Sequence, residues 1–435
     1  MINFRNNKLL KNASWLIGAK IAQAVLQLAI SMLTARYFGP SDFGVINYAE
    51  SVTTFFLPIM RLGFVNILVQ EIVHHKDSEG EILGTSIILN LFSAVLCIFS
   101  ISAFVHVANP DEPETIMVCV LYSIMLIFQA TEACLYWFQA HLLSKYSSIA
   151  TLCVFAVVSA YKFILLAAKK SIYWFAVSSA LEYMLLAAAL FVIYRKLGGK
   201  PLKFSAVVGW RLWSRGKYYI VSSMMVMIFA QTDKLMLKHM LSKASVGYYS
   251  AAVTCAGMFG FVFSAIIDSF RPIIFESKQK SEELFEEKMT QLYSVVTYLS
   301  LLQSLFTTVF AWLIIPVIFG REYTPAVSAL MIIVWYTTFS YYGAVRNIWI
   351  LAQEKQKFLW IINLSGASLN VVLNLILIPY LGINGAAIAS LLTQFFTNVL
   401  LCFIIAPIRR NNTLLIRGLN PNVLKDIAAK LLKKA

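Results

Sequence analysis

Charged side chains inside long apolar segments are the residues of this sequence best suited to chemistry. Such a charge is stable in a membrane interior only where it meets water, a ligand or a counter-charge. Four cations of this kind come from four separate segments, namely Lys20, Arg61, Lys234 and Arg346. Arginine donates paired hydrogen bonds to phosphate oxygens, and lysine supplies a point charge. We therefore expect these four side chains to line a cavity and to bind a phosphate or pyrophosphate group.

Polar residues follow the helical period in two segments. Lys20, Gln23, Gln27 and Ser31 recur at intervals of three and four residues, so they share one face of a helix. Asn370 and Asn374 share a face in the same way. Packing against polar groups of neighbouring helices is the alternative explanation for both patterns. The residues that we expect to line the cavity are Gln23, Gln27, Ser31, Asn370 and Asn374.

Three acidic residues in the apolar segments are candidates for coupling to an ion gradient. Glu50, Glu132 or Asp233 could be the carboxylate that a proton or Na⁺ neutralises, and the sequence does not choose among them. Glu50 and Arg61 project from the same helix face but lie roughly 16 Å apart along the axis, so they do not pair. Arg61 must therefore face either a cavity or a carboxylate on another helix.

The composition indicates which elements carry these side chains. Of the 435 residues, 59% are hydrophobic and only 13% are charged, whereas soluble domains have roughly 25% charged residues. The apolar residues form blocks of about 20, the length of a helix that crosses ~30 Å of hydrocarbon. We predict an all-α integral membrane protein with about twelve transmembrane helices, because helices satisfy their own backbone hydrogen bonds in lipid. The predicted segments are 13–34, 43–68, 83–107, 115–138, 147–167, 172–194, 218–240, 246–270, 292–316, 325–351, 357–379 and 382–407.

Basic residues between these segments predict the orientation of the chain. Lys and Arg concentrate on the cytoplasmic side of membrane proteins, and a cytoplasmic N-terminus places them there at a ratio of roughly four to one. Both termini are therefore expected in the cytoplasm. The formal net charge of +15 then reflects topology and attraction to anionic lipid rather than binding of nucleic acid.

Similar motifs in the two halves of the chain indicate an internal repeat. Residues 43–49, at the start of the second segment, resemble residues 246–252, at the start of the eighth, and the same alignment pairs Lys234 with Ser31. Transporters are commonly built from two related halves. We expect two six-helix bundles around a central cavity. The expected divisions are an N-terminal bundle at 1–200, a basic cytoplasmic linker at 201–217, a C-terminal bundle at 218–407 and a basic cytoplasmic tail at 408–435.

The sequence argues against an enzyme. It contains no Gly-Lys-Ser/Thr phosphate loop, and no segment outside the apolar blocks is long enough for a soluble catalytic domain. The six cysteines lie within apolar blocks without ligand-like spacing, so we expect no metal site and no cofactor. A membrane-embedded glycosyltransferase or polymerase is kept as an alternative, although the short acidic segment 109–114 looks like a solvated turn.

An ordered set of motifs extends over nearly the whole chain. It consists of residues 33–40 with Phe43 and Gly44, then 137–140, then 233–237 followed by 246–252, and finally Asn370, Asn374, 378–379, Gly382 and 385–387. No single motif is strongly specific, but the ordered set resembles the O-antigen and exopolysaccharide flippase family. That family is part of the multidrug/oligosaccharidyl-lipid/polysaccharide exporter superfamily.

The resemblance implies a flippase in a bacterial inner membrane. Its substrate would be an undecaprenyl-pyrophosphate-linked oligosaccharide, such as an O-antigen or other surface polysaccharide repeat unit, moved from the cytoplasmic to the periplasmic leaflet by alternating access. It also implies coupling to H⁺ or Na⁺ and partnership with a polysaccharide polymerase. A multidrug cation antiporter of the same superfamily is the nearest rival. Its cavity should be acidic, so the four cations favour the flippase, whereas Asp233 favours the rival.

Overall fold

The protein is helical throughout the part of the chain that a computed structural model describes, which is the backbone of residues 8–432 and the side chains of residues 23–426. No β-strand occurs within that backbone. Helices long and apolar enough to cross a membrane number eight among the described residues, or nine if one bent pair counts as a single span. The expectation of an all-α integral membrane protein is thus confirmed. The chain divides into two compact units, one up to His239 and one from Met240.

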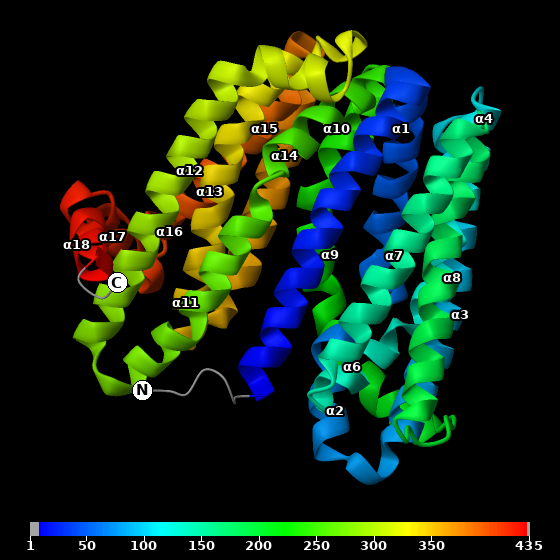
Figure 1. Cartoon of the computed structure of the whole chain (residues 1–435), viewed down its shortest axis with the longest axis horizontal. Coiled ribbons are helices and arrows are strands. Elements are labelled where there is room, and N and C mark those ends of the chain that lie inside the picture. The colour runs from blue at the N-terminus through cyan, green and yellow to red at the C-terminus, as the bar shows by residue number, and fades with distance from the viewer. Residues whose placement is uncertain (1–7, 433–435) are drawn as a thin grey trace. The chain divides into compact units, whose positions relative to one another are not determined.

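The N-terminal unit contains nine α-helices with described backbone (Figure 1). Helix α1 packs against α7, and α2 packs against α6. The bounds are α1 Lys8–Met60, α2 Leu68–His74, α3 Glu79–Ala108, α4 Pro113–Ser123, α5 Met125–Gln129, α6 Ala133–Ala140, α7 Ser144–Ala167, α8 Ile172–Lys196 and α9 Ala206–Met240.

The C-terminal unit is built around α12 and α13, which pack against each other, and α15 packs on α13 (Figure 1). Helices α10 and α11 are the pair that is bent, by 43°. The bounds are α10 Lys243–Gly257, α11 Gly260–Lys280, α12 Glu282–Ile318, α13 Ala326–Ala352, α14 Leu359–Leu381, α15 Ile383–Phe395, α16 Leu401–Ile404, α17 Arg409–Gly418 and α18 Pro421–Leu432.

Backbone conformations with positive φ end or interrupt the first predicted segments. Gly39, at φ 70° and ψ 178°, is non-helical and divides α1 into two helices, which correspond to the first two predicted segments. The second segment was predicted to run to residue 68, and this boundary is wrong. Helix α1 ends at Met60 because Leu62 and Gly63, at φ 50° and 70°, turn the chain out of the right-handed helical region.

The fourth predicted segment is the most irregular part of the N-terminal unit. Helix α5 ends at Gln129 and is followed by a 3₁₀ turn, Ala130–Glu132, before α6 begins at Ala133. Short 3₁₀ stretches within a helix often mark functional positions, because they change the direction of the side chains and the hydrogen-bonding pattern of the backbone. The last predicted segment has a comparable irregularity, since a π-helical stretch, Phe396–Leu400, separates α15 from α16.

The predicted linker 201–217 lies against the N-terminal unit instead of forming a free connection. The backbone NH of Lys203 donates to the carbonyl oxygen of Gly80 at 3.1 Å, and from Ala206 onward the chain is already helix α9. The seventh predicted segment, 218–240, is the rest of that helix and lies in the first compact unit except for its last residue. The division into bundles at 1–200 and 218–407 stays a prediction.

The predicted basic tail 408–435 forms two helices over its described part. Helices α17 and α18 pack against α12 (Figure 1). Arg410 donates to both carboxylate oxygens of Glu286, at 2.5 and 2.6 Å, and the hydroxyl of buried Tyr293 donates to Asn411 at 2.8 Å. Arg410 therefore contributes to packing within the C-terminal unit, beyond any role in membrane orientation.

A close approach of two backbones joins α9 to the turn after α1. Gly63 faces Gly216 so closely that no side chain fits at either position, and a methyl group at Gly216 would lie 2.6 Å from the carbonyl oxygen of Leu62 and 3.0 Å from the ring of Phe64. Phe64 belongs to the buried core of this unit. The contact therefore determines where the beginning of α9 lies on the core.

We expect Gly216→Ala to lower the free energy of unfolding by about 1–3 kcal/mol, because the added methyl group overpacks a closed contact. The matched control is Gly257→Ala, where a helical glycine has no atom within 4 Å of the new methyl group. That variant should raise stability by about 0.4–1 kcal/mol, since alanine restricts the unfolded chain. Denaturant unfolding in detergent micelles measures both. Equal effects of the two substitutions would contradict the packing argument.

Candidate functional site

The structure pairs one of the four predicted cations, Arg61, with one of the three predicted carboxylates, Glu132. The guanidinium Nη2 lies 2.5 Å from Glu132 Oε2, and the side chains are 31% and 16% exposed. Arg61 follows directly after α1, and Glu132 ends the 3₁₀ turn in the fourth predicted segment. Both surroundings expected for Arg61 are present, because it meets the carboxylate of another helix and also lines a small cavity.

A small cavity lies beside this ion pair. Besides Arg61 and Glu132, the groups that line it include the side-chain amides of Asn90 and Gln129 and the ring of Tyr136. Its free space amounts to about one water molecule. The two carbonyl oxygens of those amides are buried and have no hydrogen-bond partner among the described residues. Among the described residues, the lining thus combines one carboxylate, one guanidinium and two amide oxygens without a hydrogen-bond partner.

A second intramembrane pair lies in the same unit. Lys162 Nζ is 3.9 Å from Glu182 Oε2, and both side chains are about one-fifth exposed. Lys162 comes from α7 and Glu182 from α8, which pack against each other. Here the two charges of neighbouring helices compensate one another, so the pair adds no net charge to the unit.

Arg346 has different surroundings, because its hydrogen-bond partners among the described residues are neutral. It is 4% exposed, and its Nη1 donates to the carbonyl oxygen of Thr397 at 3.1 Å and to Asn398 Oδ1 at 2.7 Å. Its Nη2 donates to Asn347 Oδ1 at 3.0 Å. The Nε–H is buried without a partner among the described residues, and none of the ion pairs between them involves Arg346. No carboxylate among the described residues therefore pairs with this guanidinium.

The π-helical stretch after α15 explains how Arg346 is held. Thr397 and Asn398 lie within that stretch, and the wider helical turn brings a backbone carbonyl and a side-chain oxygen to the same guanidinium. Asn398 in turn hydrogen-bonds Gln394. Gly343, one turn before Arg346, faces the Asn398 amide so closely that a Cβ would meet it at 2.7 Å.

Asn370 and Asn374 are fully buried and form a polar pair. Asn374 Nδ2 donates to Asn370 Oδ1 at 3.1 Å, and Asn370 Nδ2 donates to Ser390 Oγ on α15 at 3.4 Å. Hydrogen bonding between helices, one of the two explanations for their spacing, is therefore present. Their contact with a substrate stays a prediction.

The other predicted site residues have varied surroundings. In α1, Gln23 and Ser31 are half-buried, whereas Gln27 and Glu50 are exposed. In α9, Asp233 is 6% exposed and Lys234 is half-buried. The side chain of Lys20 lies outside the described residues. Arg61 and Lys234 belong to the N-terminal unit and Arg346 to the C-terminal unit, so a shared site for the four cations stays a prediction.

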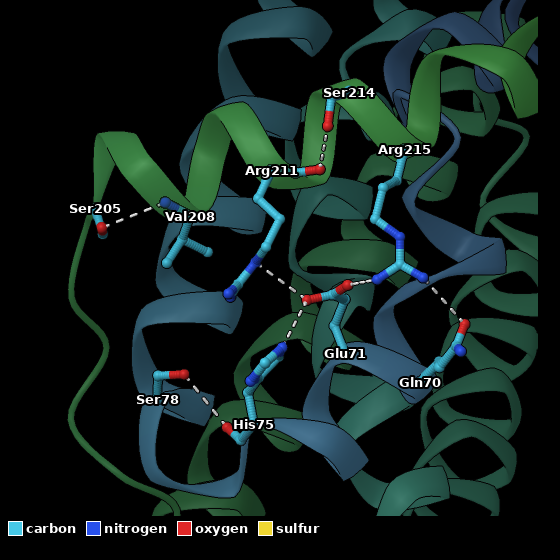
Figure 2. Close-up of polar contacts among 9 residues, drawn as sticks. All are labelled: Gln70, Glu71, His75, Ser78, Ser205, Val208, Arg211, Ser214 and Arg215. Carbon is cyan, nitrogen blue, oxygen red and sulfur yellow. Dashed lines mark hydrogen bonds and ion pairs between the residues drawn. The ribbon is translucent and has the colours of Figure 1, made fainter.

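Sequence reasoning missed a buried acidic site at the end of the N-terminal unit. Figure 2 shows Arg211 and Arg215 of α9 and His75 pointing at the carboxylate of Glu71 on α2. Glu71 is 0% exposed, Arg211 Nε lies 3.3 Å from its Oε2, and Arg215 Nη1 hydrogen-bonds its Oε1. His75 Nε2 is 3.9 Å from Oε2. We call these four residues the Glu71 cluster.

The signal for the Glu71 cluster was present in the sequence but had another explanation. Arg211 and Arg215 lie four residues apart and so share one helix face, but within a basic stretch between apolar segments they indicate only a cytoplasmic linker. Glu71 stands just beyond the second predicted segment, where a solvated carboxylate is the ordinary expectation. In the structure Glu71 is fully buried, and its carboxylate meets Arg211 and Arg215 of α9.

The Arg61–Glu132 pair predicts strong coupling between two substitutions. Glu132→Gln keeps the shape but leaves the guanidinium unpaired, and Arg61→Met leaves the carboxylate unpaired, so either should lower the free energy of unfolding by up to ~3 kcal/mol. The double variant should lose much less than the sum of the two. Unfolding in detergent micelles completes this double-mutant cycle. Additive losses would show that the two charges do not interact.

The Glu71 cluster predicts unequal effects of its members. Glu71→Gln removes the single anion that faces two arginines and should lower the free energy of unfolding by ~3 kcal/mol. Arg215→Gln should cost less, because Arg215 is 44% exposed and Arg211 and His75 remain. Glu322→Gln, at an exposed carboxylate, is the matched control. An effect of Glu71→Gln no greater than that of the control would contradict this assignment.

Comparison with known sequences gives one family match and two relatives. The pattern of the polysaccharide biosynthesis protein family matches residues 9–278. The capsular polysaccharide biosynthesis protein CapF of Staphylococcus aureus is 20% identical over 89% of this chain and 96% of that protein. An uncharacterized membrane protein of Methanocaldococcus jannaschii is 27% identical over 47% of this chain, and the match spans only 40% of that protein's length.

Comparison with solved structures shows the fold. The lipid II flippase MurJ in an inward closed conformation superposes with a TM-score of 0.74 at 13% identity, covering 93% of this chain and 90% of that one. An inward-facing multidrug resistance MATE family transporter of the MOP superfamily gives a TM-score of 0.66 at 11% identity, covering 89% of this chain and 96% of that one. The fold is therefore that of membrane transporters with twelve transmembrane helices.

Proposed function

This chain belongs to the polysaccharide biosynthesis protein family, and on that premise we propose that it is a flippase for a lipid-linked oligosaccharide. Its substrate is an undecaprenyl-pyrophosphate-linked repeat unit of O-antigen or another surface polysaccharide. The protein moves it from the cytoplasmic to the periplasmic leaflet of a bacterial inner membrane by alternating access. The similarity to a capsular polysaccharide biosynthesis protein supports a role in surface polysaccharide synthesis.

The observation that carries the choice of an anionic substrate is the environment of Arg346. A buried guanidinium with neutral partners retains a strong attraction for an anion, because nothing in its surroundings cancels the charge. Pyrophosphate offers oxygens in the arrangement that a planar guanidinium binds best. A transporter of organic cations has no use for such a charge at a buried position, since it would repel the substrate.

Arg61 differs from Arg346 because a carboxylate already pairs with it. Its charge is neutralised by Glu132 at 2.5 Å, so it attracts an anion only after the carboxylate has found another partner. Lys20 and Lys234 complete the proposed cationic set, with Gln23, Gln27, Ser31, Asn370 and Asn374 as neutral polar contacts for the sugar. The four cations thus need not act at the same stage of the transport cycle.

An ion gradient of H⁺ or Na⁺ drives the proposed transport. Glu50, Glu132 and Asp233 are the candidate coupling carboxylates, and the buried position of Asp233 and the cation partner of Glu132 distinguish both from exposed Glu50. No cofactor is required. Both termini are proposed to lie in the cytoplasm, and a polysaccharide polymerase is the proposed partner that consumes the translocated unit.

A multidrug cation antiporter is the second candidate function. The structural similarity to MATE transporters supports it as far as the fold is concerned, and buried Asp233 supplies an acidic residue of the kind that a cation substrate or a coupling ion requires. The unpaired charge of Arg346 argues for the flippase. Lipid flipping and cation efflux, measured with the wild type and Arg346→Gln, distinguish the two functions.

Arg346→Gln should lower the rate of flipping at least about tenfold, because it removes the charge for pyrophosphate while the amide keeps hydrogen bonds to its neighbours. The assay follows a fluorescent polyprenyl-pyrophosphate oligosaccharide in proteoliposomes under an imposed ion gradient. Arg346→Lys, which restores charge but not the planar donor group, should give an intermediate rate. Arg321→Gln, at an exposed arginine, is the matched control and should transport like the wild type.

Two outcomes would contradict the proposal. Flipping that is unchanged in a correctly folded Arg346→Gln variant would remove Arg346 from the binding site. Absence of lipid transport by the wild-type protein, together with efflux of small organic cations that survives Arg346→Gln, would assign the chain to the multidrug antiporters.

A further inference from the structure

We propose that Asn90, Gln129 and Glu132 form a binding site for Na⁺ inside the N-terminal unit, and that Na⁺ and the Arg61 guanidinium bind Glu132 alternately. The existence of the site does not depend on the proposed function. Its consequence for transport does rest on that function, because the guanidinium released by Na⁺ becomes available to the pyrophosphate of the substrate.

Two buried amide oxygens beside Glu132 have no hydrogen-bond donor among the described residues. Asn90 of α3 is 5% exposed and Gln129 of α5 is 2% exposed. Asn90 Oδ1 and Gln129 Oε1 have no hydrogen-bond partner among the described residues, and both side chains line the cavity beside Glu132. Buried polar atoms are nearly always satisfied, because desolvation without a partner is unfavourable. Two such oxygens on residues that line one cavity are suited to bind a cation.

The fourth predicted segment changes locally from α-helical to 3₁₀ geometry next to the cavity. Gln129 is the last residue of α5 and Glu132 the last residue of the following 3₁₀ turn, so both potential ligands come from the irregular part of the fourth predicted segment. A short 3₁₀ stretch within a helix redirects its side chains and often marks a functional position. The third ligand, Asn90, comes from a regular helix that contacts the 3₁₀ turn.

The cavity matches Na⁺ in its size, its charge and the type of its ligands. The cavity has room for about one water-sized particle. One carboxylate and two neutral carbonyl oxygens provide a single negative charge, which a monovalent ion balances and a divalent ion would exceed. All three ligands are hard oxygens, which bind hard cations, whereas transition metals prefer the imidazole and thiolate ligands that this cavity does not present among its described residues.

Competition between Na⁺ and Arg61 follows from the ion pair. With the guanidinium 2.5 Å from Glu132 Oε2, the carboxylate is already neutralised, and a second cation on the same group would meet repulsion. Na⁺ must therefore displace Arg61. Thermodynamic linkage makes the effect reciprocal, so an anion that binds displaced Arg61 strengthens Na⁺ binding by the same factor. Na⁺ thus replaces the Arg61 guanidinium on Glu132, and the released guanidinium becomes available to the anionic substrate.

The test measures binding of Na⁺ to the purified full-length protein without any lipid substrate. Apparent melting temperatures are compared in NaCl, KCl and choline chloride at constant ionic strength, because a ligand that binds only the folded state raises stability with its concentration. We expect a rise specific to Na⁺ in the wild type, and loss of that rise in Asn90→Leu and Gln129→Met, which keep the shape without the oxygen. Gln356→Met, at an exposed glutamine, is the matched control.

A third variant tests the alternation itself. Arg61→Met removes the competitor and should bind Na⁺ at least about tenfold more tightly than the wild type, within the range typical of coupled sites. Its instability in choline should be rescued by NaCl. If Arg61 served structure alone, the loss of stability would be the same in all three salts. Should Asn90→Leu fail to fold, Asn90→Asp retains an oxygen ligand and should bind Na⁺ at least as well as the wild type.

Each outcome separates this proposal from the proposed function. No Na⁺-specific stabilisation of the wild type or of Arg61→Met, or stabilisation that responds only to pH, overturns the Na⁺ site and leaves the flippase to be judged by lipid transport. Na⁺ binding that depends on Asn90 and Gln129, together with absence of lipid flipping, supports the site and overturns the function. Na⁺ binding that persists in both variants overturns the assignment of its ligands.

Discussion

Compensation of buried charge in an apolar protein is the constraint on which most of this structure depends. In hydrocarbon an ionised side chain needs a counter-ion, several neutral dipoles or water, and the chain uses the first two in different places. Arg61 and Lys162 have carboxylate partners from other helices, whereas Arg346 is surrounded by amide and backbone oxygens. A carboxylate partner offsets the charge of Arg61, whereas the neutral partners of Arg346 do not. Arg346 can therefore attract an anion more strongly than Arg61 can.

The irregular segments of the helices lie where these compensations are made. Glu132 ends a 3₁₀ turn, and the partners of Arg346 lie in a π-helical stretch. A regular helix uses all its interior carbonyls for its own hydrogen bonds, so a change of helical period is what frees an oxygen or redirects a side chain. Both deviations therefore have a local physical reason. They also place the most distinctive polar groups of each unit on the least regular backbone.

The Glu71 cluster extends the same rule to the end of the N-terminal unit. The basic residues there predict a position on the cytoplasmic side of the membrane. Arg211 and Arg215 additionally meet a carboxylate that is 0% exposed, and the glycine contact between Gly63 and Gly216 brings α9 close enough for this to happen. The stretch between the two predicted bundles is thus bound to one unit by charge and by close packing at the same time.

The sequence by itself determined the class of the protein, the approximate position of its helices and the rarity of charge within them. These features depend on the length and composition of single segments, because each segment must be long and apolar enough to cross the hydrocarbon. It also identified Arg61, Glu132 and Arg346 as residues that need compensation. Only the tertiary structure decided how each is compensated, since the partners on other helices are 51 to 71 residues distant in the chain. The early start of α9, the burial of Glu71 and the unpartnered oxygens of Asn90 and Gln129 likewise depend on which helices pack together, and no pattern within a single segment specifies that.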